Sequence, residues 1–416
     1  MSVSGGGGRA GSPSWTAGEI FELVRSGAAS SRADLARLTG LAGSTVLLRV
    51  EALLAQGYLV EGIARGSGRG RRPRMLSVRA DAGFVAMADL GPHHVVLGIM
   101  GLDGTLLTER ALPLRIGDGP GEVLPWLVGA VRELAGTLPS STGNLLGLGV
   151  GLPGPVSTAT GRMMTPSLMP GWNGCNVRAA LEELSGVPVI VENDANMMAA
   201  GEHGLIGHGV KHMMFVKVGS GIGCGVIVSG SLYRGSRGAA GDISHVRVSG
   251  APDVTCSCGR NGCLEVVASS AAVVRQMREE GADVSHAAEV LDLLDKSDPT
   301  AARVLRGAGR ATGEVLAGLV SFFNPEVLAI GGVISQAEPF VATLQATLYD
   351  WCLPMTMDGL TITTSKAGTS AGILGAGRLL LQHLLSSSSV DAALARGPLG
   401  APPLPPLPRG RSAGAT

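Results

Sequence analysis

Residues 241–265 read GDISHVRVSGAPDVTCSCGRNGCLE and place one histidine upstream of three cysteines in C-x-C-x4-C spacing. Three thiolates and one imidazole complete the tetrahedral shell that Zn2+ takes in structural sites, with no position left open for water. The alternative is a set of free thiols in a glycine-rich loop. Against it, half of the chain's 6 cysteines fall within this segment. The pattern therefore predicts a structural zinc site formed by His245, Cys256, Cys258 and Cys263.

Composition limits the class of protein. The chain has 416 residues, 45% of them hydrophobic and 16% charged, with a formal net charge of zero. This length predicts two or three domains, and the neutral balance means that any surface for nucleic acid must be local. The most apolar window, residues 315–334, is interrupted by Asn-Pro-Glu and fails as a membrane span. Residues 1–14 lack the apolar core of a secretory signal, so we expect a disordered lead and a cytoplasmic protein.

Residues 31–60 read SRADLARLTGLAGSTVLLRVEALLAQGYLV and predict two helices separated by a glycine-containing turn. Apolar residues such as Val46, Val50 and Leu53 recur at helical spacing and would face a small core. This is the outline of a helix-turn-helix, although a helical hairpin that only packs against the rest of the protein has the same outline. If the second helix enters a DNA major groove, the residues that face the bases or phosphates are Thr45, Leu48 and Arg49.

The segment after these helices is basic. A glycine-rich stretch, RGSGRGRRPR, fills residues 65–74 between two short apolar strands. A charge run by itself is usually a solvated loop. Directly behind a helix-turn-helix, it instead favours a wing that contacts phosphates or the minor groove. We therefore predict a winged helix-turn-helix DNA-binding domain over residues 15–79, with Arg69, Arg71 and Arg72 in its wing.

From about residue 82 the sequence changes to apolar runs punctuated by glycine, in which predicted strands alternate with helices. This alternation predicts an α/β domain over residues 82–382. The end of the chain, residues 386–416, is rich in serine, proline, alanine and glycine. Such composition predicts a disordered tail.

Two glycine turns in the α/β part follow predicted strands. Glycine allows the backbone N–H groups of such a turn to approach phosphate oxygens closely. Glycine-rich hairpins are also common without any ligand, so the turns alone do not establish a phosphate site. If a nucleotide binds, the residues that would contact it are Asp89, Gly91, Gly219, Ser220, Gly221 and Gly223.

A polar sequence, Glu-Asn-Asp-Ala-Asn at residues 192–196, lies at a predicted junction of strand and helix. Asp194 at this place can act as a general base that takes a proton from a substrate hydroxyl, with Asn193 bonded to a neighbouring hydroxyl. Asp194 can equally be a simple N-cap of the helix. The spacing does not separate these alternatives.

Four sequences taken together closely resemble the ROK family of sugar kinases and sugar-responsive transcriptional repressors. They are VENDANMMAAGEHG, VGSGIGCGVIVSGSLYRG, GDISH followed by CSCGRNGCLE, and FNPEVLAIGGVIS. The resemblance covers residues 82–382 and implies the actin-like ATPase fold, which is the RNase H-like, two-lobed fold of sugar kinases. The segments SRADLARLTGL and GRGRRPRML resemble the winged helix-turn-helix of the family's repressor branch.

This resemblance also implies roles for single residues. It makes His245, Cys256, Cys258 and Cys263 the zinc ligands and Asp194 the catalytic base of a kinase. In a pocket that binds a sugar, hydroxyl groups need both acceptors and donors, which carboxylates and an amide supply. The residues that the resemblance assigns to sugar binding are Gly154, Asn193, Asp194, Asp242, His245 and Glu265.

The chain departs from the family pattern at two places. Pro92, His93 and His94 stand where the sugar kinases have glycine, threonine and lysine, and proline removes a backbone donor from the phosphate loop. Asp242 stands where the family usually has a glutamate, one methylene longer, which leaves the identity of the sugar open.

Two functions of different classes follow from these observations. The first is a cytoplasmic, sugar-responsive transcriptional regulator, a repressor of carbohydrate genes, that binds operator DNA as a homodimer or homotetramer and responds to a sugar or phosphosugar. The second is a sugar kinase that depends on ATP and Mg2+. A third alternative uses the fold only as a scaffold for dimerisation. None of the three requires a membrane.

Overall fold

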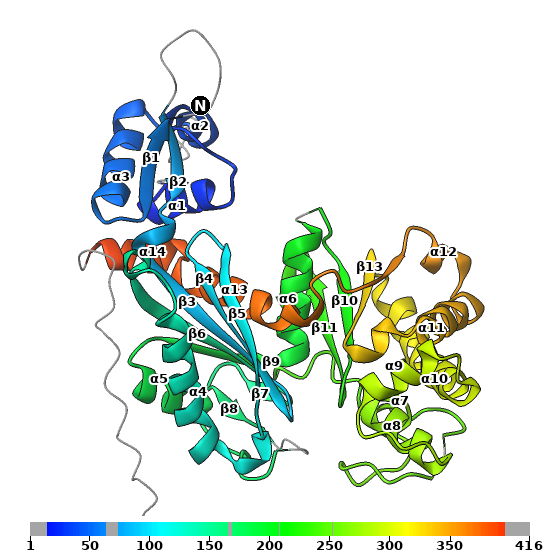
Figure 1. The fold of residues 1–416 in the computed structure, drawn as a ribbon. Helices are drawn as coiled ribbons and strands as arrows, with labels where there is room; N and C mark the ends of the chain where they lie inside the picture. Colours follow the sequence, from blue (N-terminus) through cyan, green and yellow to red (C-terminus); the bar gives the residue numbers. More distant parts are fainter. Residues whose placement is uncertain (1–14, 64–73, 165–168, 208, 252, 396–416) are drawn as a thin grey trace, which may run out of the picture.

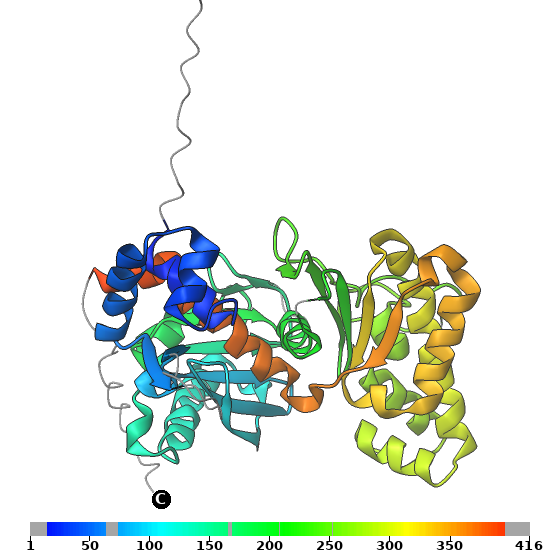
Figure 2. The same cartoon turned by 90° about the horizontal axis from the view of Figure 1, so that it is seen from above.

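The computed structural model describes residues 15–63, 74–164, 169–207, 209–251 and 253–395. Within these ranges, a small N-terminal domain of helices and a hairpin packs on a larger body of two α/β lobes (Figure 1). From above, helices α6 (Asp194–Ile206) and α13 (Ala371–Leu384) lie between the two lobes (Figure 2). This arrangement confirms the predicted two-lobed α/β fold, and the helices of the N-terminal domain are consistent with the predicted helix-turn-helix.

The described part of the N-terminal domain contains three helices and an antiparallel hairpin. The Ser31 side chain caps its second helix, and Gly40 ends that helix in the left-handed conformation, with φ of 69°. Val46, Val50 and Leu53 are buried as predicted. The elements are α1 (Ala17–Arg25), α2 (Arg32–Thr39), α3 (Gly43–Ala55), β1 (Leu59–Ile63) and β2 (Arg74–Val78). The predicted wing arginines Arg65, Arg69, Arg71 and Arg72 lie outside the described residues.

The first lobe is built on a five-stranded sheet of order β5-β4-β3-β6-β9. Its central strand β3 pairs antiparallel with β4 and parallel with β6. Because both faces of β3 and β6 are covered, their sequences are nearly continuous apolar runs. The elements are β3 (Gly83–Leu90), β4 (His94–Gly101), β5 (Leu106–Pro113), α4 (Pro120–Ala135), β6 (Asn144–Leu152), β7 (Val156–Ser157), β8 (Arg162–Met163), α5 (Val177–Ser185) and β9 (Val189–Asn193).

The second lobe repeats this topology in the sheet β12-β11-β10-β13-β14. Strand β10 pairs antiparallel with β11 and parallel with β13, as β3 does with its neighbours. A helical segment is inserted between β12 and β13. The elements are β10 (Met213–Val218), β11 (Ile222–Val228), β12 (Ser231–Tyr233), α7 (Leu264–Ala268), α8 (Ser270–Glu279), α9 (Ala287–Asp295), α10 (Pro299–Phe323), β13 (Val327–Gly331), α11 (Glu338–Trp351), α12 (Pro354–Met357) and β14 (Thr361–Thr364).

Helices α6 and α13 cross in close contact between the lobes. A side chain at Gly201 would overlap the backbone carbonyl of Ala371, and one at Gly375 would overlap that of Met197. Glycine at these two positions therefore sets how closely the helices approach. Because the lobes meet at these helices, their crossing fixes the separation of the two sheets.

The prediction of disorder from residue 386 onward was wrong for its first part. Residues Ser387–Leu394 form helix α14, and Val390 is fully buried. The serine-rich composition obscured two features that favour a helix. Ser386 caps the helix, and Val390 and Leu394 are one turn apart. Residues 396–416 lie outside the described part.

Helix α14 joins the N-terminal domain to the first lobe. One apolar cluster contains Phe21 of α1, Val390 of α14, Ile373 of α13 and Met87 of β3. Directly packed side chains thus connect α13 to α1. Among the described helices, none is long and apolar enough to cross a membrane.

Candidate functional site

A cavity of about 520 Å3, here called the cleft, opens between the two lobes. Its wall comes from the β9–α6 junction, the β10–β11 turn and the segment 238–265. The structure brings together in this wall every residue that the resemblance assigned to sugar binding: Gly154, Asn193, Asp194, Asp242, His245 and Glu265.

The β9–α6 junction directs Asp194 into the cleft. Asn193 is the N-cap of α6, and its side chain accepts a hydrogen bond of 3.2 Å from the Asn196 N–H. Asp194 is therefore not the N-cap, which removes the simpler of the two alternatives. Its Oδ1 accepts from the Ala195 N–H at 2.7 Å and from Asn193 Nδ2 at 3.1 Å. These bonds fix the orientation of the carboxylate.

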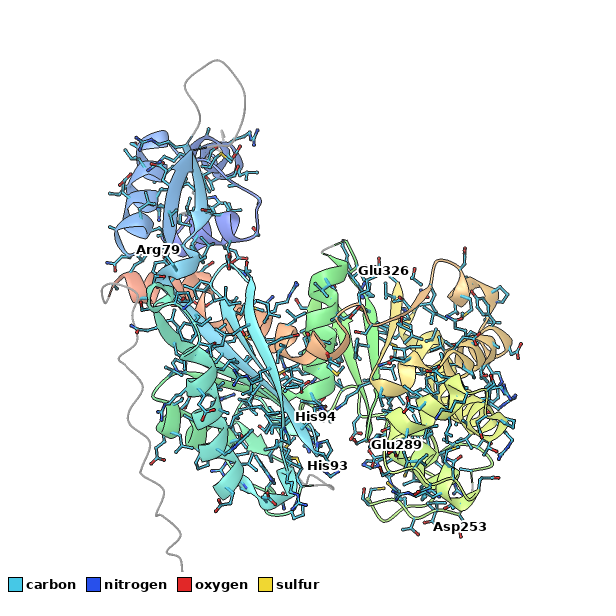
Figure 3. The ribbon with its side chains drawn as sticks, in the orientation of Figure 1. Arg79, His93, His94, Asp253, Glu289 and Glu326 are labelled. Carbon is cyan, nitrogen blue, oxygen red and sulfur yellow. The ribbon has the colours of Figure 1, made fainter. Side chains whose placement is uncertain are left out.

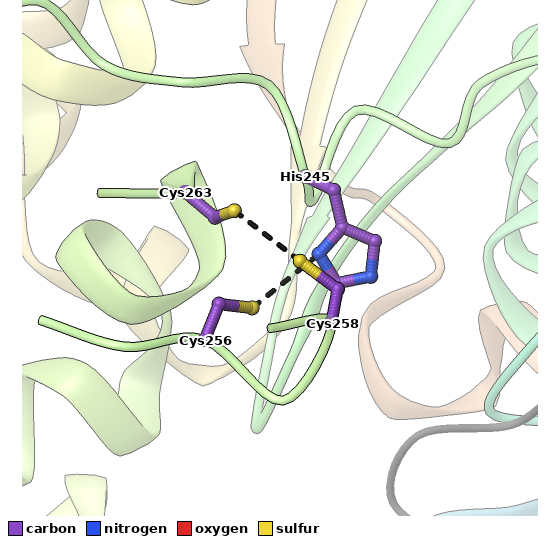
Figure 4. Close-up of side chains that lie close together, drawn as sticks. All are labelled: His245, Cys256, Cys258 and Cys263. Carbon is purple, nitrogen blue, oxygen red and sulfur yellow. Dashed lines mark hydrogen bonds between the residues drawn. The ribbon is translucent and has the colours of Figure 1, made fainter. Parts of the chain in front are cut away.

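The predicted metal ligands form one cluster. The ligand atoms of His245, Cys256, Cys258 and Cys263 all lie within 4.8 Å of one another. Cys256 Sγ is 3.5 Å from His245 Nδ1, and Cys258 Sγ is 3.6 Å from Cys263 Sγ (Figure 4). Sulfur ligands of a tetrahedral zinc ion stand about 3.8 Å apart, given Zn–S bonds of about 2.3 Å. The cluster thus has the donors and the spacing to hold a metal ion.

A tight turn in the backbone assembles this cluster. Thr255 and Asn261 form an isolated β-bridge, and Gly259 between them has φ of 81°, which favours glycine. Cys256 and Cys258 lie on this turn, while Cys263 is the N-cap of α7. The cysteines are therefore fixed by backbone geometry as well as by sequence spacing.

His245 connects the cluster to the cleft. Its Nδ1 faces the sulfur atoms, and its other ring nitrogen lies on the opposite side of the ring (Figure 4). The residue also lines the cleft beside Glu265. Burial raises the pKa of Glu265, while His245 opposes this shift and Asp242 adds to it. Asp242 accepts a hydrogen bond of 2.7 Å from Ser244 Oγ, which holds the shorter acid in place.

Comparison with known proteins identifies the family. Residues 85–383 match the ROK family. The chain belongs to the ROK family. It is 30% identical over 377 residues to the xylose repressor of Caldicellulosiruptor bescii, across 86% of this chain and 92% of the repressor. It is 29% identical over 311 residues to the glucokinase of Halalkalibacterium halodurans, across 71% of this chain and 94% of the enzyme.

A solved structure shares the fold of nearly the whole ROK protein described here. It is that of a ROK family transcriptional regulator, a homologue of the Escherichia coli MLC protein. The two superimpose with a TM-score of 0.77 and 24% identity, over 92% of this chain and 98% of that chain. The solved structure of a putative N-acetylmannosamine kinase from Listeria monocytogenes, with a TM-score of 0.60 and 23% identity, covers 72% of this chain and 99% of that chain.

Lys217 is a cleft residue that the sequence reasoning missed. In this ROK protein its ammonium group is in contact with Asp194 Oδ2. Burial opposes the charge on Lys217, but Asp194 and Asp89 outweigh it and raise the pKa of the lysine. A signal was present, because a lysine within the apolar strand MMFVKV requires a buried partner.

The two predicted phosphate turns differ from expectation. Ser220, Gly221 and Gly223 line the cleft, but Asp89, Gly91 and Gly219 are not part of its wall. The Gly91 N–H donates to the His94 carbonyl at 2.8 Å and the Gly219 N–H to the Gly221 carbonyl at 3.0 Å. Both donors are therefore engaged within their own turns.

The β3–β4 turn carries two histidines. His93 and His94 lie at the end of this hairpin (Figure 3). Burial lowers the pKa of His94, and the positive charges of Lys217 and His93 lower it further. The imidazole of His94, packed over Gly91, thus stands where the kinase pattern has a phosphate loop.

The outward face of α3 is partly as predicted. Leu48 is 73% exposed, whereas Thr45 and Arg49 are half-buried. Helix α3 begins after Ala42 without a side-chain cap, which leaves its first N–H groups open. Such a helix end is suited to contact with a phosphate group.

Proposed function

We propose that this ROK protein is a sugar-responsive transcriptional regulator, in which the N-terminal domain binds operator DNA and the cleft binds the sugar. The observation that carries the proposal is the packing of the N-terminal domain, through α14 and α13, on the lobe that forms half of the cleft. Closure of the lobes around a ligand would then move the DNA-binding helix. The xylose repressor among the relatives supports this assignment.

The sugar would be held by the acids, the amide and His245 of the cleft wall. Asp194, Asp242 and Glu265 supply acceptors, and Asn193 supplies both a donor and an acceptor. We take the ligand to be a neutral monosaccharide or its phosphate. Lys217, which lies in the same wall, can donate to a hydroxyl or to a phosphate oxygen.

We assign Zn2+ to the His245, Cys256, Cys258 and Cys263 cluster, as a structural ion. Four protein ligands leave no position for a reacting water, so the ion supplies rigidity rather than chemistry. Bound through Nδ1, His245 would have its other ring nitrogen fixed toward the sugar. The metal cluster would thus set the angle at which the ligand is held.

The alternative function is an ATP- and Mg2+-dependent sugar kinase. It is favoured by the glucokinase relative and by the presence of Asp194 in the cleft. Two observations weigh against it. The contact with Lys217 occupies the carboxylate that must accept a proton, and the N–H groups of Gly91 and Gly219 are engaged within their turns.

We expect a homodimer, because two-fold related half-sites are read by two copies of a winged helix. Large apolar side chains are exposed on the second lobe, including Phe322 at 90% and Met355 at 81% exposure. A second copy of the chain is the partner we assign to this surface. Light scattering should give twice the monomer mass, and Phe322→Glu should lower it.

A mobility-shift series with DNA from upstream of the gene, repeated across a panel of sugars and phosphosugars, tests the regulator. We expect specific binding that one sugar changes. Hexose phosphorylation that Asp194→Ala abolishes, without specific DNA binding, would replace the regulator with the kinase.

A further inference from the structure

A second cavity, of about 570 Å3, lies between strands β9 and β12 and is called here the edge cavity. Each of these strands is the outer strand of its sheet. Helices α5, α6 and α13 complete the wall, and no residue of it belongs to the wall of the cleft. The edge cavity is thus a separate feature that the proposed sugar site does not use.

Among the charged side chains around the edge cavity, arginines outnumber acids. Its wall contains three arginines, Arg178, Arg234 and Arg378, against two glutamates, Glu182 and Glu192. Glu192 forms an ion pair with Arg234, in which Arg234 Nε lies 2.6 Å from Glu192 Oε2. Glu182 accepts from the Val189 N–H at 3.2 Å. Within the described residues, neither acid forms an ion pair with Arg178 or Arg378.

Arg178 is held by neutral groups. Its guanidinium donates to the Ala159 carbonyl at 3.2 Å and to that of Thr158. Carbonyl oxygens satisfy N–H donors but carry no net charge. They orient the guanidinium at the wall of the cavity and leave its positive charge without an ion pair in the described part of the chain.

Arg378 has still fewer contacts. Within the described part of the chain, its guanidinium forms neither an ion pair nor a side-chain hydrogen bond, although the residue is half-buried. Burial lowers its pKa, and the charge of Arg25 adds to this effect. A half-buried guanidinium with open donors requires an anion or water as its partner.

The remaining wall combines apolar side chains with polar ones such as Gln382 and His383. Ile190, Leu232 and Leu379 line the edge cavity together with the backbone of β9 and β12. The volume exceeds that of an inorganic ion and suits a small organic molecule. A ligand with an anionic group for the arginines and a carbon skeleton for these side chains would satisfy both parts of the wall.

We propose that the edge cavity is a second ligand site, which binds a small organic anion through Arg178 and Arg378. The anionic group is a phosphate or a carboxylate, since the guanidinium fork matches both. The site adds a metabolite signal to the sugar signal of the cleft.

This site is placed to act on the N-terminal domain. Arg378 lies on α13, which leads into α14. The positive charge of Arg25, on α1, acts on the Arg378 guanidinium. Arg25 is already paired with Glu22, at 2.7 Å, so an anion at Arg378 would relieve the part of the repulsion between the two arginines that this pair leaves. Occupation of the edge cavity should therefore stabilise the contact of α1 with the first lobe.

Calorimetric titration of the full-length protein with glucose 6-phosphate, gluconate and glucose tests the proposal. Arg378→Gln should weaken binding of the anion at least about tenfold, because a charged hydrogen bond is lost. Asp194→Asn, in the cleft, should leave unchanged the anion binding that Arg378→Gln weakens. The two anions tell phosphate from carboxylate, and Arg306→Gln on the distant α10 is the matched control.

Three results would overturn the proposal. The first is that neither anion binds at concentrations up to about 10 mM. The second is that the wild type and Arg378→Gln bind the anion equally well. The third is that Asp194→Asn no longer binds the anion. The last would place the anion in the cleft. If Arg378→Gln is misfolded by circular dichroism, Arg178→Gln replaces it with the same expected loss. Binding of neutral sugar and of DNA is measured separately, so failure of the proposed function remains distinguishable.

Discussion

The backbone N–H of Gly18 in α1 donates a hydrogen bond of 2.8 Å to Asp391 Oδ1 in α14. The two residues are separated by almost the whole chain, and they join the N-terminal domain to the C-terminal helix. The contact is close, because a Cβ atom at Gly18 would overlap the backbone carbonyl of Ser387. Changes in the lobes thus have a direct physical connection to α1.

Gly18→Ala should separate α1 from α14. The overlap is with backbone and cannot be relieved by a side-chain rotation, so the helices must move apart. We expect the N-terminal domain to remain folded and to bind DNA, while its response to sugar is reduced. Hydrogen exchange of α14, together with DNA titrations with and without sugar, measures both effects.

Gly307→Ala is the matched control, because this glycine also lies within a helix and has open space around its Cβ position. It should stabilise α10 by about 0.5–1 kcal/mol and leave the sugar response intact. A Gly18→Ala protein with normal protection of α14 and a normal response would show that the helix contact is not the connection.

Asp89→Asn should change how stability depends on pH. Burial raises the pKa of Asp89 from 3.8 to about 6, although Lys217 acts in the opposite direction. Between these values the folded state binds more protons than the unfolded state, so the free energy of unfolding falls as pH rises. The free energy of unfolding of Asp89→Asn, relative to that of the wild type, should therefore rise by about 2 kcal/mol when the pH is raised from about 4.5 to about 7.5.

Urea unfolding at the two pH values measures this gain. Glu133→Gln, an exposed change on α4, serves as the control. The same free-energy difference between Asp89→Asn and the wild type at both pH values would refute the raised pKa.

Cys263→Ser should remove the metal and, with it, the fixed position of His245. The sulfur of Cys263 is one of the four clustered donors, whereas Cys175 is not. We expect metal content by mass spectrometry to fall in Cys263→Ser and to stay normal in Cys175→Ser. The sugar response should be lost before the fold is, and a normal response without metal would contradict the role given to the cluster.

Arg49→Ala should weaken operator binding by about 1–3 kcal/mol if the arginine contacts a base, with relaxed specificity at that base pair. If it contacts a phosphate, the loss should be uniform across sequences and the salt slope should fall by about 1. Leu48→Ala tests the most exposed apolar side chain of α3. Unchanged DNA affinity in both variants would remove α3 as the recognition helix.

Much of this account was predictable from sequence because its signals are local. The cysteine spacing predicted the cluster of His245, Cys256, Cys258 and Cys263, and the helical period of Val46, Val50 and Leu53 predicted the core of the N-terminal domain. Residues from distant segments, such as Gly154 and Glu265, were assigned by resemblance to the ROK family, and the structure places them in one cleft.

The features that were missed depend on contacts between segments far apart in the chain. Helix α14 is stable because Val390 packs against the N-terminal domain, which the composition of residues 386–416 does not reveal. The partner of Lys217 is known only once β10 lies beside the start of α6. The engagement of the Gly91 N–H likewise depends on the hairpin with His94.

The central claim is that a sugar in the cleft controls DNA binding by the N-terminal domain. Fluorescence anisotropy of labelled DNA from the upstream region, titrated with and without the sugar selected by the panel, tests it most directly. We predict that the sugar shifts the DNA Kd at least about tenfold in the wild type and not in Asp194→Asn, which binds DNA normally. Equal DNA affinity of the wild type with and without every sugar of the panel, or an undiminished shift in Asp194→Asn, would contradict the claim.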